Sequence, residues 1–532
     1  MPDRNAETCT FSNFQRSLRE PKEFTLTFEL VPSRGGHSRE QSRIVSLARH
    51  IADDKRFHAV SITENAGGHP ALSPEVLGIE IMDMGLDVIT HFSCKDKNRN
   101  QMESLLFGWD RQGLCNLLVL SGDYPKKGFQ GEPKPVFDLD SVQALHLISR
   151  MNHGRFDGHK TDDRENPFRP TNFFMGVAVS PFKLRQAEQV LQYYKLHRKV
   201  AAGAAYAITQ VGYDPRKFHE LLLYVRRNEL DLPLLGNVFI PNLAVAERMY
   251  RGGIPGCIIT DQHYALIQKE AKSTDKGKRA RLLRAAKLLC VLKKMGYSGA
   301  HLGGPGLNFA DLDFVLGQAA SFEKDWRSFI EELSFWPTNG YFFYEKEEKT
   351  GLNRPEQRPA PQKARHIFVH YELAKLVHNL AFSKRGALFR PGKAACLYFA
   401  ETRFAQWLTH FEHIAKFLLF GCQNCGDCTL AELAFICPQS GCAKYLLNGP
   451  CGGSRDGWCE VYPGRKRCMY VILYERAEKD GITENWQQGY VPPRNWALNN
   501  SSSWVNFYLG KDHAGVATKK PADSDCRSQS SS

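Results

Sequence analysis

The chain has 532 residues, which is too long for one ordinary domain, so two domains are expected. Its residues are 42% hydrophobic and 24% charged, as in a soluble globular protein, and no run of about 18 apolar residues is present to predict a membrane span. The first residues lack the apolar core of a signal peptide, so we expect a cytoplasmic protein with no membrane partner.

The formal net charge of +13 raises the question of a nucleic-acid partner. The basic residues are scattered, and their densest group, between Lys272 and Arg284, fits the solvated face of a helix. No nucleic-acid motif accompanies that group, so we expect no nucleic-acid partner. An acidic substrate or an acidic electron-transfer partner explains the charge better.

After a polar leader over residues 1–22, which we expect to be flexible, β segments alternate with helical patterns over residues 23–325. There are eight β segments: Glu23–Val31, His58–Thr63, Leu86–Phe92, Cys115–Ser121, Asn172–Val179, Ala205–Gln210, Leu234–Phe239 and Gly299–Leu302. Eight strands, each followed by a helical pattern, predict an α/β fold of the (β/α)8 TIM barrel type, because a doubly wound sheet usually stops at about five to seven strands.

Polar residues stand near the carboxyl ends of several predicted strands. In a barrel these ends meet at one rim, where active sites lie. The residues are Glu29, Thr63, Glu64, His91, Asp123 and Gln210. Any one of them could be a loop residue that satisfies backbone groups, but together they predict a functional rim.

The second half of the chain differs in composition. Residues 326–365 contain a charged run and several prolines, which predicts an exposed linker. Residues 366–510 begin with apolar residues at helical spacing and end in a cysteine-rich stretch, so we expect a smaller, helical, metal-binding domain there. The serine-rich segment 511–532 is expected to be a disordered tail.

Eight of the 15 cysteines gather in that second domain: Cys422, Cys425, Cys428, Cys437, Cys442, Cys451, Cys459 and Cys468. Cytosolic reductants keep such thiols reduced, so metal ligation is favoured over disulfides. The C-x2-C-x2-C run and the later Cys-Pro resemble ferredoxin-type ligation, and eight thiolates would fill two 4Fe-4S clusters. A zinc site, alone or beside a cluster, and unliganded cysteines remain the alternatives.

Residues 23–320 resemble the methylenetetrahydrofolate reductase family. The resemblance rests on the order and spacing of Phe28-Glu-Leu-Val-Pro32, Val60-Ser-Ile-Thr63, Thr90-His-Phe-Ser-Cys94, Leu118-Val-Leu-Ser-Gly-Asp-Tyr-Pro125, Lys199-Val-Ala-Ala-Gly203 and Ala207-Ile-Thr-Gln210. The cysteine-rich domain, through Cys437-Pro438 and Asn448-Gly-Pro-Cys-Gly-Gly453, looks like the small partner subunit of such reductases in acetogenic bacteria, here fused to the barrel.

The resemblance implies roles for matched residues. Glu29 stands where the family has its general acid, which protonates the departing nitrogen as the folate ring opens. Asp123 matches an aspartate between pterin and flavin, and Gln210 matches a folate-contacting glutamine. Thr63, His91 and Lys199 match flavin-contacting positions; FAD and FMN both remain open. Because Glu29 must hold a proton near neutral pH, we expect a desolvated pocket that raises its pKa.

Two departures from the family affect the electron donor. Glu64-Asn-Ala66 replaces the usual Tyr-Gly-Ala, and Val177-Ala-Val-Ser-Pro181 stands where a glutamate and a histidine are common. The donor is therefore either NAD(P)H or a low-potential electron carrier that acts through the cysteine-rich domain. An electron-transfer protein is a candidate partner, and we expect an oligomer.

Two hypotheses follow from these residues. The first is a flavin-dependent methylenetetrahydrofolate reductase that interconverts 5,10-methylenetetrahydrofolate and 5-methyltetrahydrofolate. The second is an inactive folate-binding or electron-relay scaffold with a zinc-stabilised C-terminal domain. The presence of Glu29, Asp123 and Gln210 together favours the enzyme.

Overall fold

The structure is a computed structural model that describes residues 11–20, 22–126, 128–156, 169–358, 369–399 and 402–515. The expectations for the start of the leader, for the linker and domain start over 359–368, and for the tail from 516 onward lie outside the described residues.

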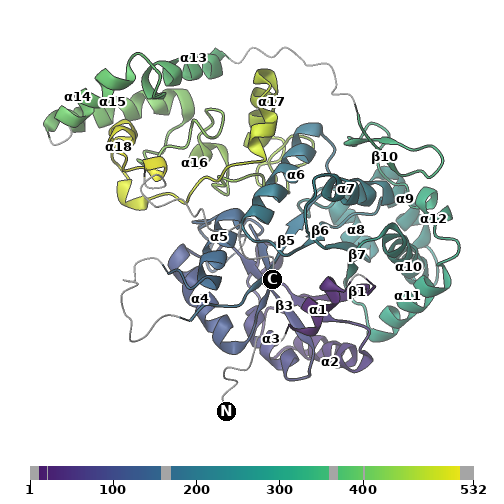
Figure 1. The fold of residues 1–532 in the computed structure, drawn as a ribbon. Helices are drawn as coiled ribbons and strands as arrows, with labels where there is room; N and C mark the ends of the chain where they lie inside the picture. The colour runs from purple at the N-terminus through teal and green to yellow at the C-terminus, as the bar shows by residue number, and fades with distance from the viewer. Residues whose placement is uncertain are drawn as a thin grey trace, which may run out of the picture.

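Eight parallel strands close into a barrel in the order of the chain, which confirms the predicted (β/α)8 fold (Figure 1). Closure is made by β1, which pairs with β2 through Thr27 and Ala59 and with β8 through Thr25 and Gly299. The strands are β1 (Thr25–Leu30), β2 (Ala59–Ile62), β3 (Asp87–Ser93), β4 (Asn116–Leu120), β5 (Phe174–Val179), β6 (Tyr206–Thr209), β7 (Leu234–Phe239) and β8 (Gly299–Gly303). Each lies close to its expected range.

Helices surround the strands, and one large hydrophobic core fills the space between the two layers. These helices are η1 (Ala66–Gly68), α2 (Arg39–Asp54), α3 (Pro74–Met82), α4 (Arg99–Gln112), α5 (Ser141–Asn152), α6 (Gln186–Ala201), α7 (Pro215–Arg227), α8 (Leu243–Tyr250), α9 (Asp261–Glu270), α10 (Lys278–Met295) and α11 (Phe309–Ser321).

The amino-terminal end of the barrel is filled by α1 (Asn13–Arg19). Phe14 is fully buried in a core that includes Tyr206 and Ile208 of β6, and its ring meets the Tyr206 ring edge to face at 5.1 Å. The backbone N–H of Phe14 donates to Asp87 at 2.6 Å. This packing differs from the flexible leader expected for residues 1–22, because a single buried aromatic residue gives no periodic signal in so short a segment.

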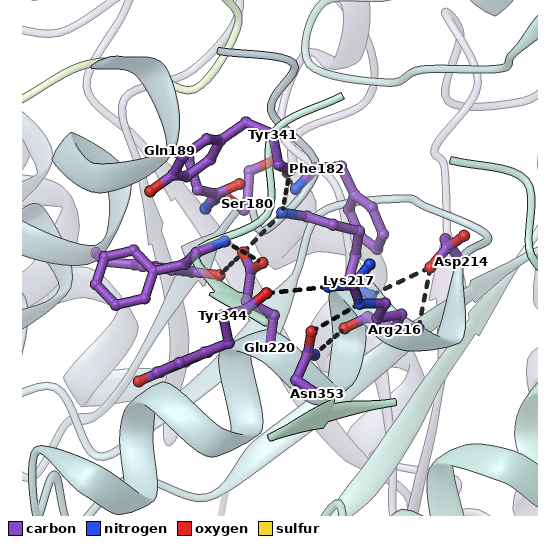
Figure 2. Close-up of polar contacts among 12 residues, drawn as sticks. Ser180, Phe182, Gln189, Asp214, Arg216, Lys217, Glu220, Tyr341, Tyr344 and Asn353 are labelled. Atoms are coloured by element: carbon purple, nitrogen blue, oxygen red, sulfur yellow. Dashed lines mark hydrogen bonds and ion pairs between the residues drawn. The ribbon is translucent and has the colours of Figure 1, made fainter. Parts of the chain in front are cut away.

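Residues 328–357 also pack on the barrel, unlike the exposed linker expected from their charge and proline content. They form α12 (Ser328–Glu332) and the antiparallel pair β9 (Tyr344–Lys346) and β10 (Asn353–Gln357), which lies against α7. The side chain of Asn353 donates to the Arg216 carbonyl at 2.7 Å and accepts from the Arg216 guanidinium at 2.9 Å (Figure 2).

A buried ion pair holds this segment to α7. Lys217 and Glu220 are fully buried and 2.6 Å apart, and Lys217 also donates to the Tyr341 carbonyl (Figure 2). Glu220 accepts from the backbone N–H of Phe343 at 2.7 Å and from the hydroxyl of Tyr193 at 2.8 Å. Because buried charges are tolerated only when paired and hydrogen-bonded, these contacts fix where the segment lies.

The remaining helices form the cysteine module, here defined as residues 369–515 without 400 and 401. It lies beside α5 and α6 (Figure 1). Its core is shared with the barrel, because Val190, Leu191 and Tyr194 of α6 pack with Leu446, Tyr470 and other buried residues of the module. Its helices are α13 (Val369–Val377), η2 (His378–Phe382), α14 (Phe389–Phe399), α15 (Arg403–Phe420), α16 (Pro438–Gly441), α17 (Met469–Asp480), η3 (Thr483–Trp486), η4 (Trp496–Leu498) and α18 (Ser503–Leu509).

Two further findings concern the ends of predicted segments. The expected tail begins at residue 511, but His513 is buried and donates its backbone N–H to Asp427 at 3.2 Å. Over the part of the chain that the structure describes, no helix is both long enough and apolar enough to cross a bilayer.

We predict that Lys217→Met lowers the free energy of unfolding by about 3–5 kcal/mol, because it leaves the buried Glu220 carboxylate without its cation. Urea denaturation followed by tryptophan fluorescence measures the change. Arg251→Met, which removes the exposed Arg251–Glu247 pair, is the control and should unfold like the parent protein. Equal midpoints for Lys217→Met and the parent would show that the buried pair does not stabilise the fold.

Candidate functional site

A large cavity of about 2150 Å³ opens where the barrel strands end. Common ligand pockets measure about 300–1,000 Å³, so this one has room for two sizeable ligands side by side. It is lined by the seven rim and flavin positions singled out from the sequence: Glu29, Thr63, Glu64, His91, Asp123, Lys199 and Gln210. The tertiary structure therefore brings all seven into one site, where Glu64 pairs with Lys97.

Glu29 lies on β1 beside His301 of β8, a residue that the sequence reasoning missed. The His301 Nε2 atom is 3.9 Å from the Glu29 carboxylate, and Nδ1 of the same ring is 2.7 Å from the Thr27 hydroxyl. The histidine is buried, whereas Glu29 is partly open to the cavity. His301 is therefore held against one side of the carboxylate, and the other side faces the space for a ligand.

The expected rise in the pKa of Glu29 is wrong for this site. Burial does push the pKa upward, but the proximity and charge of His301, with a smaller effect of His91, lower it below its ordinary value. The sequence placed a carboxylate in a barrel mouth but did not reveal the imidazole across from it. The signal available was His301 itself, inside the predicted eighth strand.

Among the described residues, several buried polar atoms in the cavity wall have no hydrogen-bond partner. Four of them are Thr63 Oγ1, His91 Nε2, Gln192 Nε2 and Asn237 Oδ1. Burial lowers the pKa of His91 to about 4, so its ring is neutral near pH 7. Buried polar groups are normally satisfied, so these four atoms indicate a polar ligand that completes their hydrogen bonds.

Asp123 belongs to the loop after β4 and holds a neighbouring loop in place. Its carboxylate accepts the backbone N–H of Gly67 at 2.7 Å. The two loops approach so closely that a Cβ on Gly68, where φ is +80°, would lie 2.2 Å from the Tyr124 carbonyl oxygen. Asp123 is thus a well-positioned acceptor at the cavity wall.

Gln210 and Lys199 have backbone partners that orient them. The Gln210 carbonyl oxygen accepts the Val211 N–H at 2.8 Å, which leaves its amide nitrogen as a donor to the cavity. Lys199 donates to the Ala178 carbonyl at 2.6 Å, and burial lowers its pKa well below the ordinary value. Both residues can therefore present donors to a ligand without further rearrangement.

The cysteine module supplies one wall of this cavity, which the sequence did not predict. Lys444 is buried, pairs with Glu460 and donates to the Gly122 carbonyl at 2.7 Å, next to Asp123. The wall also includes Pro450, Cys451, Gly452, Gly453, Val461, Tyr462 and Arg465. The site is consequently composite, made by both halves of the chain.

Buried side chains of the barrel anchor that wall. Asp140 accepts the backbone N–H groups of Leu447 and Asn448 at 3.0 and 2.7 Å. Lys195 donates to the Gly449 and Pro450 carbonyls at 3.2 and 3.0 Å. These contacts place the segment that carries Cys451 at the mouth of the barrel.

The eight cysteines fall into two sets of four. The second set, Cys442, Cys451, Cys459 and Cys468, lines one small cavity inside the module. The first set comprises Cys422, Cys425, Cys428 and Cys437, in which Cys428 and Cys437 lie close enough to Cys422 and Cys425 to raise their pKa values further, beyond the rise caused by burial. Cys451 lines both the small cavity and the large one, so the second set adjoins the candidate site.

The described residues contain no group of three or more His, Cys, Asp or Glu side chains placed as ligands around a single ion. Burial raises the pKa of Cys451 to about 12 and that of Cys422 to about 11, so both are thiols near neutral pH in this structure. Metal ligation requires their deprotonation. The metal prediction for the eight cysteines therefore stays a prediction.

Comparisons with known proteins agree along most of the chain. The family model described as "Methylenetetrahydrofolate reductase" matches residues 13–290, and one described as "Methylene-tetrahydrofolate reductase C terminal" matches residues 402–497.

Curated relatives match at low identity. The 5,10-methylenetetrahydrofolate reductase of Salmonella typhimurium is 25% identical over 206 residues, which are 38% of this chain and 60% of that protein. Methylenetetrahydrofolate reductase 2 of Saccharomyces cerevisiae is 25% identical over 221 residues, which are 41% of this chain and 34% of that protein. The chain thus spans less than two thirds of the length of these relatives.

Among solved structures, an uncharacterized protein from Clostridium thermocellum, described as binding two copies of 5-methyl-5,6,7,8-tetrahydrofolic acid, is 11% identical. Its TM-score is 0.42, and the match covers 59% of this chain and 100% of that one.

We predict that His301→Phe raises the pKa of Glu29 above the ordinary value of 4.5, because it removes the largest influence that lowers this pKa and leaves burial in place. Infrared difference titration measures the carboxyl band, and Glu29→Gln identifies it. His263→Phe, at a buried histidine that stacks on Phe335, is the control and should leave the band unmoved. An unchanged Glu29 pKa in His301→Phe would contradict the assignment.

Proposed function

The chain belongs to the methylenetetrahydrofolate reductase family, whose model covers more than half of it, and we propose that it interconverts 5,10-methylenetetrahydrofolate and 5-methyltetrahydrofolate. The observation that carries the proposal is the convergence of Glu29, Asp123 and Gln210 on one cavity with unsatisfied polar atoms in its wall. A folate-binding scaffold would need no acid beside the reacting nitrogen, so the enzyme is favoured over that alternative.

Reduction of the methylene bridge requires ring opening before hydride arrives. In this proposal Glu29 delivers a proton to the departing nitrogen, which exposes an electrophilic iminium carbon on the substrate. Asp123 accepts hydrogen bonds from the pterin and stabilises its developing positive charge, while the Gln210 amide donates to the pterin ring. A bound flavin supplies hydride transfer to that carbon.

The proton on Glu29 needs a source, because the pKa of this carboxyl lies below its ordinary value. A planar ligand that fills the cavity excludes water from the carboxylate, and this desolvation favours the protonated form. His301, 3.9 Å away and hydrogen-bonded to Thr27, is placed to share that proton with Glu29. We therefore propose that Glu29 and His301 hold the catalytic proton together.

The residues present fit a flavin. Thr63 and His91 offer buried atoms without partners among the described residues, and Lys199 offers a side-chain amine donor in the cavity wall. We propose that these three side chains would contact the flavin, FAD or FMN. Gln192 and Asn237, which the sequence reasoning did not select, have unpartnered atoms in the same wall and would join them.

We also propose that the two cysteine sets would hold two 4Fe-4S clusters, which supply one-electron transfer. Two observations support this proposal. The eight cysteines divide into two sets of four, and the four cysteines of the second set line one small cavity. The module would then be a fused equivalent of the small partner subunit of acetogen-type reductases, in keeping with the C-terminal family match. Zinc bound by these cysteines, in place of the clusters, remains the alternative.

The position of the second set favours a low-potential carrier over NAD(P)H as donor. Cys451 stands in the wall of the catalytic cavity, where the module already occupies part of the mouth. Electrons that enter through that wall do not require a binding site for a nicotinamide cofactor in the cavity. We place the protein in the cytoplasm, with an electron-transfer protein as partner.

We predict that Glu29→Gln slows the reduction of 5,10-methylenetetrahydrofolate by the photoreduced protein by about 10²–10⁴-fold, the usual range for a lost general acid. Stopped-flow absorbance measures the rate at which methylenetetrahydrofolate reoxidises the flavin. Glu247→Gln, an exposed residue of α8, is the control. If the parent protein does not catalyse this reaction, the proposed enzyme function is wrong and the scaffold alternative is favoured.

We predict about eight irons and eight acid-labile sulfides per chain in protein purified without oxygen, and about half of each in Cys451→Ser. Cys290→Ser, at a buried cysteine of α10, should keep the full content. Plasma emission spectrometry and a sulfide assay measure both. Zinc without sulfide in the parent protein would overturn the iron–sulfur assignment.

A further inference from the structure

Helix α15 exposes a row of apolar side chains and buries two charged ones, Glu412 and Lys416. Trp407, Phe411, Ile414 and Leu418 recur at spacings of four, three and four residues and are 61, 53, 61 and 77% exposed. This is the spacing of one helical face. We call these four residues the apolar stripe.

The opposite face of α15 is fixed by a buried polar network. Glu412 and Lys416 pair at 2.8 Å, and both are buried. Glu412 accepts from the hydroxyls of Ser502 and Ser503 at 2.5 Å each, and Lys416 donates to Ser503 at 2.6 Å. Rolling the helix to hide the apolar stripe would break this satisfied network, so the stripe stays outward.

Neighbouring helices of the module also expose apolar side chains. On α14, which packs against α15, Leu397 and Tyr398 are exposed. On α13 and η2, Leu373, Leu376 and Leu380 are exposed at helical spacing. Exposed apolar surface of this extent is typical of a site where another molecule binds.

A partner seated on the stripe would lie across the width of α15 from Cys428 of the first cysteine set. Helix α15 ends at Phe420, and Cys422 follows after one glycine. Within the same helix, the Lys416 ammonium is 3.6 Å from the Cys428 sulfur. Electron transfer weakens steeply with distance, so an electron carrier would gain most by docking here.

The charge on the neighbouring helix indicates the chemistry of the partner. Lys384, Arg385, Arg390 and Lys393 are exposed just before α14 and in its first turns, and α14 packs against α15. Among the described residues, none of the four has an ion-pair partner. Basic side chains on the helix next to an exposed apolar face complement an acidic protein, steer its approach and suit the small interfaces of transient redox complexes.

We propose that the apolar stripe and these four basic residues form the docking surface for an acidic, low-potential one-electron carrier protein, which would deliver electrons to the first cysteine set. This inference rests on the proposed function. Two carrier molecules each lose one electron, and two electrons with two protons convert one 5,10-methylenetetrahydrofolate into one 5-methyltetrahydrofolate.

The probe is a small acidic ferredoxin with two 4Fe-4S clusters, used with the full chain purified without oxygen. Biolayer interferometry measures binding of the oxidised ferredoxin. Trp407→Glu/Ile414→Glu should weaken binding by about tenfold or more, as expected for the loss of central apolar anchors. Lys384→Glu/Lys393→Glu should weaken it and flatten its dependence on salt. Val76→Glu, at an exposed apolar residue of α3, should bind like the parent protein.

Flavin bleaching separates docking from the proposed function. Reduced ferredoxin should bleach the flavin of Trp407→Glu/Ile414→Glu about tenfold more slowly than that of the parent, whereas reduced methyl viologen should act equally on both. If methyl viologen fails to bleach the flavin of the parent protein, the electron route in the proposed function is wrong, whatever the binding result.

Three results would overturn the docking proposal itself. They are equal ferredoxin binding by the parent and Trp407→Glu/Ile414→Glu, a parent dimer that this variant converts to a monomer in light scattering, and binding of the parent, but not of the variant, to vesicles of anionic phospholipid. The second result would assign the stripe to a second copy of the chain, and the third to a lipid surface.

Discussion

The composite site depends on the buried carboxylate of Asp140. One of its oxygens accepts the Val142 and Gln143 N–H groups at the start of α5, and the other accepts the Leu447 and Asn448 N–H groups. A buried carboxylate is tolerated only when its hydrogen bonds are satisfied. The barrel carboxylate therefore needs N–H donors from the module, and the buried N–H groups of the module need this acceptor from the barrel. This constraint sets where the segment from Gly449 to Gly453 can lie.

Buried lysines at the same interface act in a similar way. Lys183 and Lys195 of the barrel donate to carbonyls of the module, at Ser454, Gly449 and Pro450, while Lys444 of the module donates to the Gly122 carbonyl of the barrel. Each is a charge removed from water and compensated by backbone dipoles. Together they bring Cys451 into the wall that also contains Asp123 and Glu29. The proposed chemistry needs this proximity, because the folate, the flavin and the electron entrance must share one space.

The eight strands and the rim residues at their ends were predictable from local patterns. Apolar runs such as Leu234–Phe239 are long enough to signal a buried strand, and a polar residue such as Gln210 directly after a strand must reach the carboxyl end of the barrel. By contrast, the sequence around Asn353 is typical of a linker, because most of its residues are polar or charged and face water. A few buried contacts, which the sequence does not reveal, hold this segment to α7. Its packing depends on the Lys217–Glu220 pair, and local propensity carries no sign of that pair.

The sequence by itself determined the barrel, the positions of Glu29, Asp123 and Gln210 at its rim, and the gathering of eight cysteines in the second half. Strand and rim signals are local, because they depend on alternation, composition and the direction of neighbouring side chains. Only the tertiary structure decided that His301 lowers the pKa of Glu29, that the cysteines divide into two sets, and that the module closes one side of the cavity. The first and last of these features arise between residues hundreds of positions apart, and all three depend on distances that only folding establishes.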